Sequence, residues 1–175
     1  MLLNLETVPH FYKNYVKQID EGDILQALRI SGHRAQELIH SIHIDKTDYR
    51  YANGKWTIRE VLCHMIDAEW IFAYRALRFA RNDKTPLSGW EENDYAPHMN
   101  VSGRNLKKIA DEMGHLRSST IDLFESFSTE MLTRKGTANK NEMTVAILGF
   151  VIAGHETHHC KILNERYLTP GSGNL

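Results

Sequence analysis

Two histidines in the last quarter of the sequence have the spacing of metal ligands. His155 and His159 lie in the stretch Gly154-His155-Glu156-Thr157-His158-His159-Cys160. Residues four apart on a helix lie on the same face, so the two imidazoles can reach one metal ion. The same face has the periodicity of a buried seam, formed by Leu148, Ile152, His155, His159 and Ile162. Because a buried polar group without a partner is costly, the two histidines need one.

Three interpretations account for this pair. The first is two core histidines that hydrogen-bond to neighbouring side chains. The second is the His-Glu-x-x-His pattern of zinc proteases, with Glu156 as the general base. In that case only Glu165 remains downstream as a third ligand, on the same helix. The third adds His64 from another helix, since three neutral imidazoles plus water form an open, catalytic type of zinc site. His158 competes with His159 as the second ligand, and the seam favours His159.

Amphipathic periodicity predicts the elements that position these side chains. Apolar residues recur at steps of three and four in a short opening helix over residues 8–19. The same pattern predicts four long helices, over residues 24–42, 57–82, 102–127 and 143–168. Capping residues support three of the starts: Asp23 with Gln26, Thr57 with Glu60, and Ser102 as an N-cap.

The segments between these helices show no helical period. Residues 83–101 form a long connection, and loops of this length are often functional. A polar turn is expected around residues 136–141, and no run alternates as a strand should. We therefore predict an all-α fold, a four-helix bundle with a short extra N-terminal helix. The connection between its second and third long helices is expected to cross one end of the bundle.

Length and composition exclude several classes of protein. A chain of 175 residues fits one domain, expected over 1–175 with its core at about 8–168 and a flexible tail at 169–175. Lys and Arg total 21 against 22 Asp and Glu, so no net positive charge favours nucleic acid or an anionic membrane. Cys63 and Cys160 form no disulfide framework, and no segment reaches the roughly 20 apolar residues of a membrane span. We expect a soluble, cytoplasmic protein.

Three segments of the sequence resemble the DinB superfamily. They are KWTIREVLCHMIDAE at 55–69, YRALRFAR at 74–81 and AGHETHH at 153–159. That superfamily includes YfiT-like metal-dependent hydrolases and bacillithiol transferases. The resemblance implies a four-helix bundle, frequent homodimers, and a divalent metal, zinc or nickel, held by His64, His155 and His159. It implies no DNA binding, and it leaves the reaction and the substrate open.

The residues and the resemblance together favour a metal-dependent enzyme that acts on a small molecule. The metal is expected to bind water or a low-molecular-weight thiol and to lower its pKa, so that hydroxide or thiolate attacks an electrophilic substrate. Hydrolase and thiol transferase both fit this chemistry. The alternative is a non-catalytic bundle in which the metal only holds the helices together, with a closed fourth ligand.

Several side chains around the histidines are candidates for supporting roles. Glu156 and Asp67 are expected to orient metal ligands from outside; the alternatives are an ion pair of Glu156 with Arg75 or Arg78 and a solvated Asp67. Adjacent positions on a helix point about 100° apart, so Cys63 and Cys160 are expected to be buried, inert thiols. Three residues of the long connection are candidates for the rim of a substrate pocket, or alternatively pack the bundle end: Trp90, Asp94 and Tyr95. Arginines are expected to attract an anionic thiol, or else to lie on a solvated face: Arg75, Arg78 and Arg81. Arg75 is also a candidate for the pocket rim.

Overall fold

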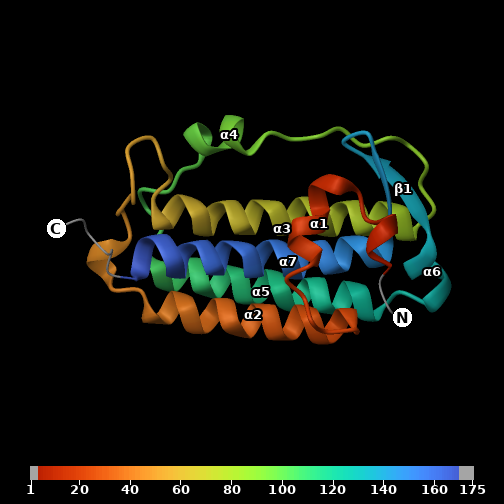
Figure 1. Ribbon diagram of the computed structural model, residues 1–175, viewed down its shortest axis with the longest axis horizontal. Coiled ribbons are helices and arrows are strands. Elements are labelled where there is room, and N and C mark those ends of the chain that lie inside the picture. The colour runs from red at the N-terminus through yellow and green to blue at the C-terminus, as the bar shows by residue number, and fades with distance from the viewer. Residues whose placement is uncertain (1–3, 170–175) are drawn as a thin grey trace.

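Four long helices form the body of the molecule in the computed structural model, which describes residues 4–169 (Figure 1). They are α2 (Ile24–Ser41), α3 (Ile58–Ala80), α5 (Leu106–Glu125) and α7 (Val145–Ile162), and α7 continues as a π-helical segment over Leu163–Leu168. The predicted four-helix bundle is confirmed. The predicted tail lies outside the described residues beyond Thr169. Among the helices described, none is long and apolar enough to cross a membrane.

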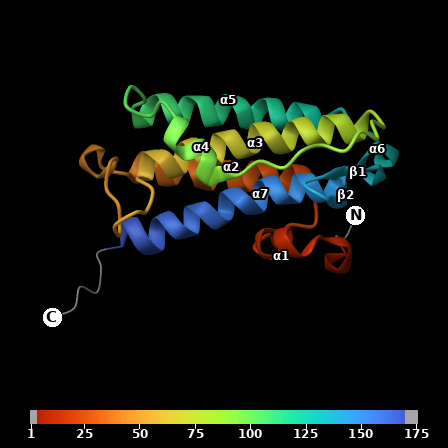
Figure 2. The ribbon, with the colours of Figure 1, turned by 90° about the horizontal axis from the view of Figure 1, so that it is seen from above.

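The connection after α3 runs along the length of the bundle, so the prediction that it crosses one end is wrong. α3 and α5 lie side by side and point in the same direction, so the chain must return along the length of α3 before α5 begins (Figures 1 and 2). This crossover contains the short helices α4 (Glu92–Tyr95) and η3 (Ala96–His98). Parallel neighbours in a bundle require a long connection of this kind.

Helix starts follow their capping residues, with one exception. Asp23 caps α2 by accepting from the Gln26 backbone N–H, as predicted. α5 begins later than predicted, because Asn105 and not Ser102 accepts the first free N–H, that of Lys108. Both have a short polar side chain that can cap a helix, so their types alone did not decide between them.

A β-hairpin that the sequence did not predict connects α6 (Thr129–Thr133) to α7. β1 (Lys135–Ala138) pairs antiparallel with β2 (Asn141–Thr144), so the expectation of no strand is wrong. Its strands are too short to show an alternating pattern, and its turn residues, Asn139 and Lys140, take positive φ angles of 48° and 61° without a glycine. The hairpin also binds the crossover, since the Leu87 N–H donates to the Thr137 carbonyl at 2.9 Å.

In the N-terminal segment, α1 (His10–Val16) packs against α7. A 3₁₀ turn, η1 (Leu5–Thr7), precedes α1, and another, η2 (Ile44–Lys46), follows α2. α1 approaches α7 at Gly154, where an added Cβ would lie 2.3 Å from the Tyr15 carbonyl oxygen. Only glycine allows this contact. Tyr12 and Tyr15 are thereby placed beside the helix turn that carries His155.

A layer of polar side chains divides the apolar core into two halves. One half surrounds Phe79 and Leu148, and the other surrounds Leu62 and Ile109. Every long helix contributes a buried polar residue to the level between them: Ser31, Glu69, Arg117 and Glu156.

Arg117 is the centre of this layer. Its Nε and Nη2 donate to the two Glu69 carboxylate oxygens at 2.9 and 2.8 Å, and its Nη1 donates to Glu156 Oε2 at 2.7 Å. Nη1 also lies 2.7 Å from the Leu28 carbonyl oxygen and 2.8 Å from Ser31 Oγ. One side chain of α5 is therefore bonded to α2, α3 and α7. Burial raises the pKa of Glu156, while the Arg117 guanidinium opposes that rise.

The alternative role considered for Glu156, an ion pair with Arg75 or Arg78, is therefore wrong. Arg75 and Arg78 do not pair with it; Arg117 does. Arg117 directly follows Leu116 of the predicted apolar face, and Glu69 directly follows Ala68. Their position next to an apolar stripe was the one sequence feature that indicated burial of Arg117 and Glu69. Periodicity does not say which helices will face each other, so it could not indicate that the two side chains pair.

Replacing Arg117 by methionine should destabilise the protein by roughly 3–5 kcal/mol, because it leaves two buried carboxylates without their cation. Equilibrium urea unfolding measures the change. Lys107→Met is the matched control, since Lys107 forms an exposed ion pair with Asp111 on the same helix and should cost about 0.5 kcal/mol or less. Equal effects of the two substitutions would contradict the central role of Arg117.

Gly154→Ala should destabilise the protein by about 1–3 kcal/mol, because the new methyl group overlaps the α1 backbone. The matched control is Gly114→Ala on α5, where the nearest atom would be Gln36 Nε2 at 3.6 Å. There the higher helix propensity of alanine should stabilise the protein by up to about 1 kcal/mol. Urea midpoints of both variants test this, and a neutral Gly154→Ala would show that α1 does not need the close approach.

Candidate metal centre

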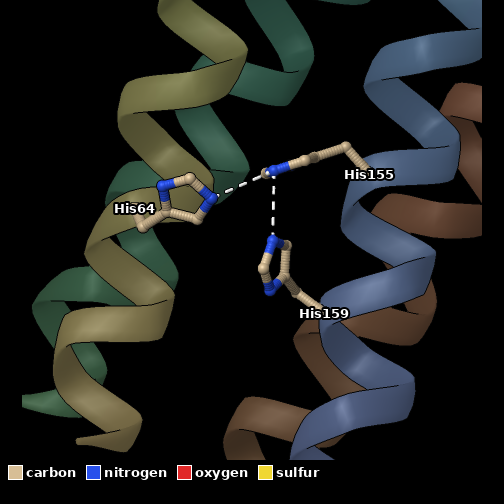
Figure 3. A group of neighbouring side chains, drawn as sticks. All are labelled: His64, His155 and His159. Carbon is tan, nitrogen blue, oxygen red and sulfur yellow. Dashed lines mark hydrogen bonds between the residues drawn. The ribbon is translucent and has the colours of Figure 1, made fainter. Parts of the chain in front are cut away.

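Three histidine side chains from two helices meet inside the bundle (Figure 3). His64 projects from α3, and His155 and His159 project from successive turns of α7. His155 Nε2 lies 3.1 Å from His64 Nε2 and 3.1 Å from His159 Nε2. One nitrogen from each of the three rings lies within 4.8 Å of the others. The structure thus brings together all three residues that the sequence and the family resemblance singled out.

The charge state of the cluster suits a cation. Burial lowers the pKa of His64 to about 4, and burial together with the neighbouring imidazoles lowers the pKa values of His155 and His159 well below the usual value. All three rings are therefore neutral at pH 7, the form that binds metals.

Hydrogen bonds among the three histidines do not by themselves explain why their ring nitrogens lie so close together. His155 Nε2 can donate one proton or offer one lone pair, but it faces two other Nε2 atoms. Two ligands of a tetrahedral zinc ion lie about 3.3 Å apart when each metal–nitrogen distance is about 2.05 Å. The two separations from His155 Nε2, 3.1 Å each, are close to that value, and all three nitrogens lie within 4.8 Å of one another, so the donor set fits one divalent ion.

His158 does not belong to this cluster. Its Nδ1 lies 3.3 Å from Gln18 Nε2, and its ring packs against the Tyr15 ring at 5.2 Å. His158 is therefore turned toward the N-terminal segment, whereas His159, one residue later, faces His64. The seam periodicity favoured His159 over His158, and His159 is the one that lies in the cluster.

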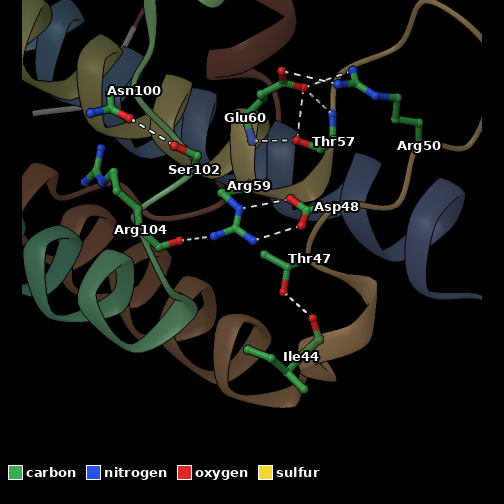
Figure 4. Close-up of polar contacts among 10 residues, drawn as sticks. All are labelled: Ile44, Thr47, Asp48, Arg50, Thr57, Arg59, Glu60, Asn100, Ser102 and Arg104. Atoms are coloured by element: carbon green, nitrogen blue, oxygen red, sulfur yellow. Dashed lines mark hydrogen bonds and ion pairs between the residues drawn. The ribbon is translucent and has the colours of Figure 1, made fainter.

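The start of α3 fixes the height of His64 in the bundle (Figure 4). Thr57 and Glu60 form a reciprocal capping box, with the Glu60 backbone N–H 3.1 Å from Thr57 Oγ1 and the Thr57 N–H 2.7 Å from Glu60 Oε2. Arg59 ties this end to its surroundings: it donates twice to the Asp48 carboxylate, at 3.0 Å each, and to the Arg104 carbonyl oxygen. The predicted capping box is confirmed, and His64 follows it about two turns later.

Aromatic rings enclose the cluster. The Trp56 ring lies 5.0 Å from the His64 ring, and the Trp90 ring stacks on it at 5.6 Å with an angle of 30°. The Tyr15 ring packs edge-on against His155 at 5.3 Å. Trp90, predicted for a pocket rim, thus reaches the site from the crossover.

A cavity of about 40 Å³ opens beside the histidines. His64 and His155 form part of its wall, and Arg75 and Trp90, two of the predicted rim residues, do so as well. The sequence did not single out the other polar groups in its wall: Tyr12, Tyr15, Glu92 and Asn139. The two tyrosines belong to the apolar face of the predicted opening helix. Their hydroxyl groups were the only sequence feature that could have indicated a role in a polar cavity.

The other predicted rim residues lie in a different place. Asp94 and Tyr95 line a separate, open cleft of about 670 Å³, together with Asp67 and Cys63. The Tyr95 ring packs on the Trp90 ring with centres 5.2 Å apart. Tyr95 therefore contacts a residue of the histidine cavity without lining that cavity itself. Asp67, expected to orient His64, makes no hydrogen bond to it within residues 4–169, and His64 Nδ1 has no partner there. Burial raises the pKa of Asp67.

The two cysteines are buried, as predicted. Burial raises the pKa of Cys63, and it raises that of Cys160 to about 12. Both thiols are therefore protonated at neutral pH and are poor metal ligands and nucleophiles. Glu156 is likewise turned away from the histidines, toward Arg117, and this position does not suit the general base of a zinc protease.

Comparisons with known proteins agree with this geometry. The family model of the DinB superfamily matches residues 27–163. Among solved structures, YfiT from Bacillus subtilis aligns with a TM-score of 0.72 and 16% identity, over 81% of this chain and 82% of that one. YfiT is described as "a probable metal-dependent hydrolase with an unusual four-helix bundle topology", and at this identity the likeness shows the shared fold. No curated protein matches significantly. The match over most of its length establishes that this chain belongs to the DinB superfamily.

Proposed function

We propose that His64, His155 and His159 hold one divalent metal ion and that the protein is a metal-dependent enzyme acting on a small molecule. The observation that carries the proposal is the convergence of three neutral imidazole nitrogens beside a cavity. Membership of the DinB superfamily and the description of YfiT support it. Zinc and nickel are the proposed metals, since both accept imidazole ligands.

A bound divalent ion supplies Lewis acidity, which lowers the pKa of a coordinated water or thiol. The protein's own residues define where that chemistry takes place. The imidazoles stay neutral because burial disfavours their protonation. Trp56 and Trp90 cover His64 and keep bulk water from it. The cavity admits only a small group to the histidines, so the reacting end of a substrate must be compact.

Hydrolysis and thiol transfer remain the two proposed reactions. The scaffold alternative differs from both, because it requires a fourth protein ligand. Among the residues described, the histidine cluster includes three ligating side chains and no cysteine or carboxylate. The cavity beside His64 and His155 therefore favours an open coordination position and an enzyme.

Elemental analysis of purified wild type and single variants tests the metal site. Wild type should contain about one equivalent of zinc or nickel, and His64→Ala and His159→Ala should lose at least tenfold in metal affinity, since each removes one of three ligands. His158→Ala is the matched control and should retain the metal, because its ring faces Gln18. Metal retained without His64 would refute a site built across two helices.

The pH dependence of stability tests the burial of the neutral imidazoles in the metal-free protein. An unfolded histidine titrates near 6.5 and His64 in the fold near 4, so the unfolded state binds more protons between these values. Stability should be fully present above about pH 6.5 and fall as the pH decreases toward 4, by about 3 kcal/mol from His64 alone. His155 and His159 act in the same direction.

Urea unfolding after chelation, at several pH values between 7.5 and 4.5, measures this slope. His64→Gln should make it shallower. His33→Gln is the control, because His33 is exposed on α2 and its removal should leave the slope unchanged. An identical slope in wild type and His64→Gln would mean that His64 is hydrated in solution.

A further inference from the structure

Arg75 is a buried arginine in the wall of the histidine cavity. It lies on α3, three turns after His64, with only 3% of its surface exposed. It shares the cavity of about 40 Å³ with His64 and His155. Arginine is almost never this deeply buried unless its charge is paired.

The contacts of Arg75 within residues 4–169 do not use all of its donors. Its Nη2 donates to the Ser88 carbonyl oxygen at 3.0 Å, and its guanidinium lies over the Phe72 ring at 5.8 Å. Neither contact neutralises the charge. Within residues 4–169 no carboxylate oxygen comes within the 4.0 Å of an ion pair with it, although Glu92 lines the same cavity.

Arg117 shows what the same side chain does when its role is structural. It is buried to a similar extent, at 6% exposure, but two carboxylates and two further oxygens surround it. The two buried arginines therefore differ in their partners: in the part of the chain that the structure describes, two carboxylates pair with Arg117 and none lies within ion-pair distance of Arg75.

We propose that Arg75 binds an anionic group of the substrate, a carboxylate or a phosphate, and thereby selects small oxyanions for the metal centre. This inference rests on the proposed function. A guanidinium presents its N–H groups as a planar fork that matches an oxyanion with two parallel hydrogen bonds. Tyr12 lies in the wall of the same cavity as Arg75, and the Arg75 charge opposes the rise that burial causes in the Tyr12 pKa. The Tyr12 hydroxyl offers a further donor to the same group.

The size of the cavity agrees with this ligand class. A space of about 40 Å³ holds a group about as large as one carboxylate, and not a bulky apolar substituent. Because His64 and His155 are in the same wall, an anion held by Arg75 places the adjoining atoms of its molecule next to the metal site. Arg75 is thus a specificity-determining residue that orients substrate by its charged end.

Binding of simple anions to the chelated, metal-free protein tests the inference without any assay of activity. The probes are sodium acetate and sodium phosphate, titrated against sodium chloride at equal ionic strength, and the readout is the Tm. Wild type should show a saturable rise of about 3–5 °C at an anion concentration of about ten times Kd. A response to acetate alone identifies a carboxylate, a response to phosphate alone a phosphoryl group, and either supports the proposal.

Variants assign the response to Arg75. Arg75→Gln should abolish it and, without anion, should be at least as stable as wild type, because an unpaired buried charge is removed. Arg81→Gln is the matched control: it removes an exposed charge at the end of the same helix and should leave the response unchanged. Glu92→Gln should strengthen the anion response, because it removes from the cavity wall a negative charge that repels the anion.

Two results would overturn the inference: an equal anion response in wild type and Arg75→Gln, or no saturable response in wild type. If Arg75→Gln does not fold, Arg75→Lys takes its place; it keeps the charge, loses the fork and should weaken binding at least tenfold. Metal content is measured on the same variants and should not change. If Arg75→Gln loses the anion response but retains the metal, the result supports Arg75 as the anion-binding residue. If wild type responds to anions but never binds metal, the proposed function is refuted and the anion site is still supported.

Discussion

The ion pairs of Arg117 with Glu69 and Glu156 are the constraint on which the rest of the bundle depends. A charge in the core is tolerated only where its partners are held in place, so the guanidinium fixes α3 and α7 relative to α5, and its bonds to Leu28 and Ser31 add α2. An apolar core would permit small rotations of each helix. The charged layer does not, because any rotation would separate a buried charge from its partner.

This constraint reaches the histidines through a single peptide bond. Glu156 follows His155 on α7, and adjacent helical residues point about 100° apart. With Glu156 directed at Arg117, His155 is necessarily directed toward α3 and α1, where His64 and Tyr15 are found. Glu69 does the same for α3, five residues after His64. The network thus stabilises the fold and sets the orientation of the two helices that carry the cluster.

The sequence was sufficient for the parts of the structure that periodicity and caps control. The seam spacing placed His155 and His159 on one face, and the capping box at Thr57 set the register of α3 that turns His64 inward. Partners across the core could not be predicted, because a stripe shows that a residue is buried but not which helix it faces. For this reason the arginines considered as partners of Glu156 did not include Arg117. Asp94 and Tyr95, candidates for the rim of the histidine site, line a different cavity, which the sequence could not show because the path of the crossover has no periodicity.

The hairpin explains why the least predictable segments decide what reaches the site. β1 binds the crossover at Leu87, and three residues later Trp90 stacks on His64 and closes one side of the cavity. α1 closes another side, docked at Gly154. Four long helices therefore fix the ligating atoms, while two short, irregular pieces of chain fix the space around them. Both pieces also contribute buried residues to the core, such as Tyr12 and Val16 of the N-terminal segment and Met143 of the hairpin. Changes at their other positions, which line the cavity, would alter the space around the histidines at less cost to the bundle. A common scaffold with different activities is the outcome expected of such a division.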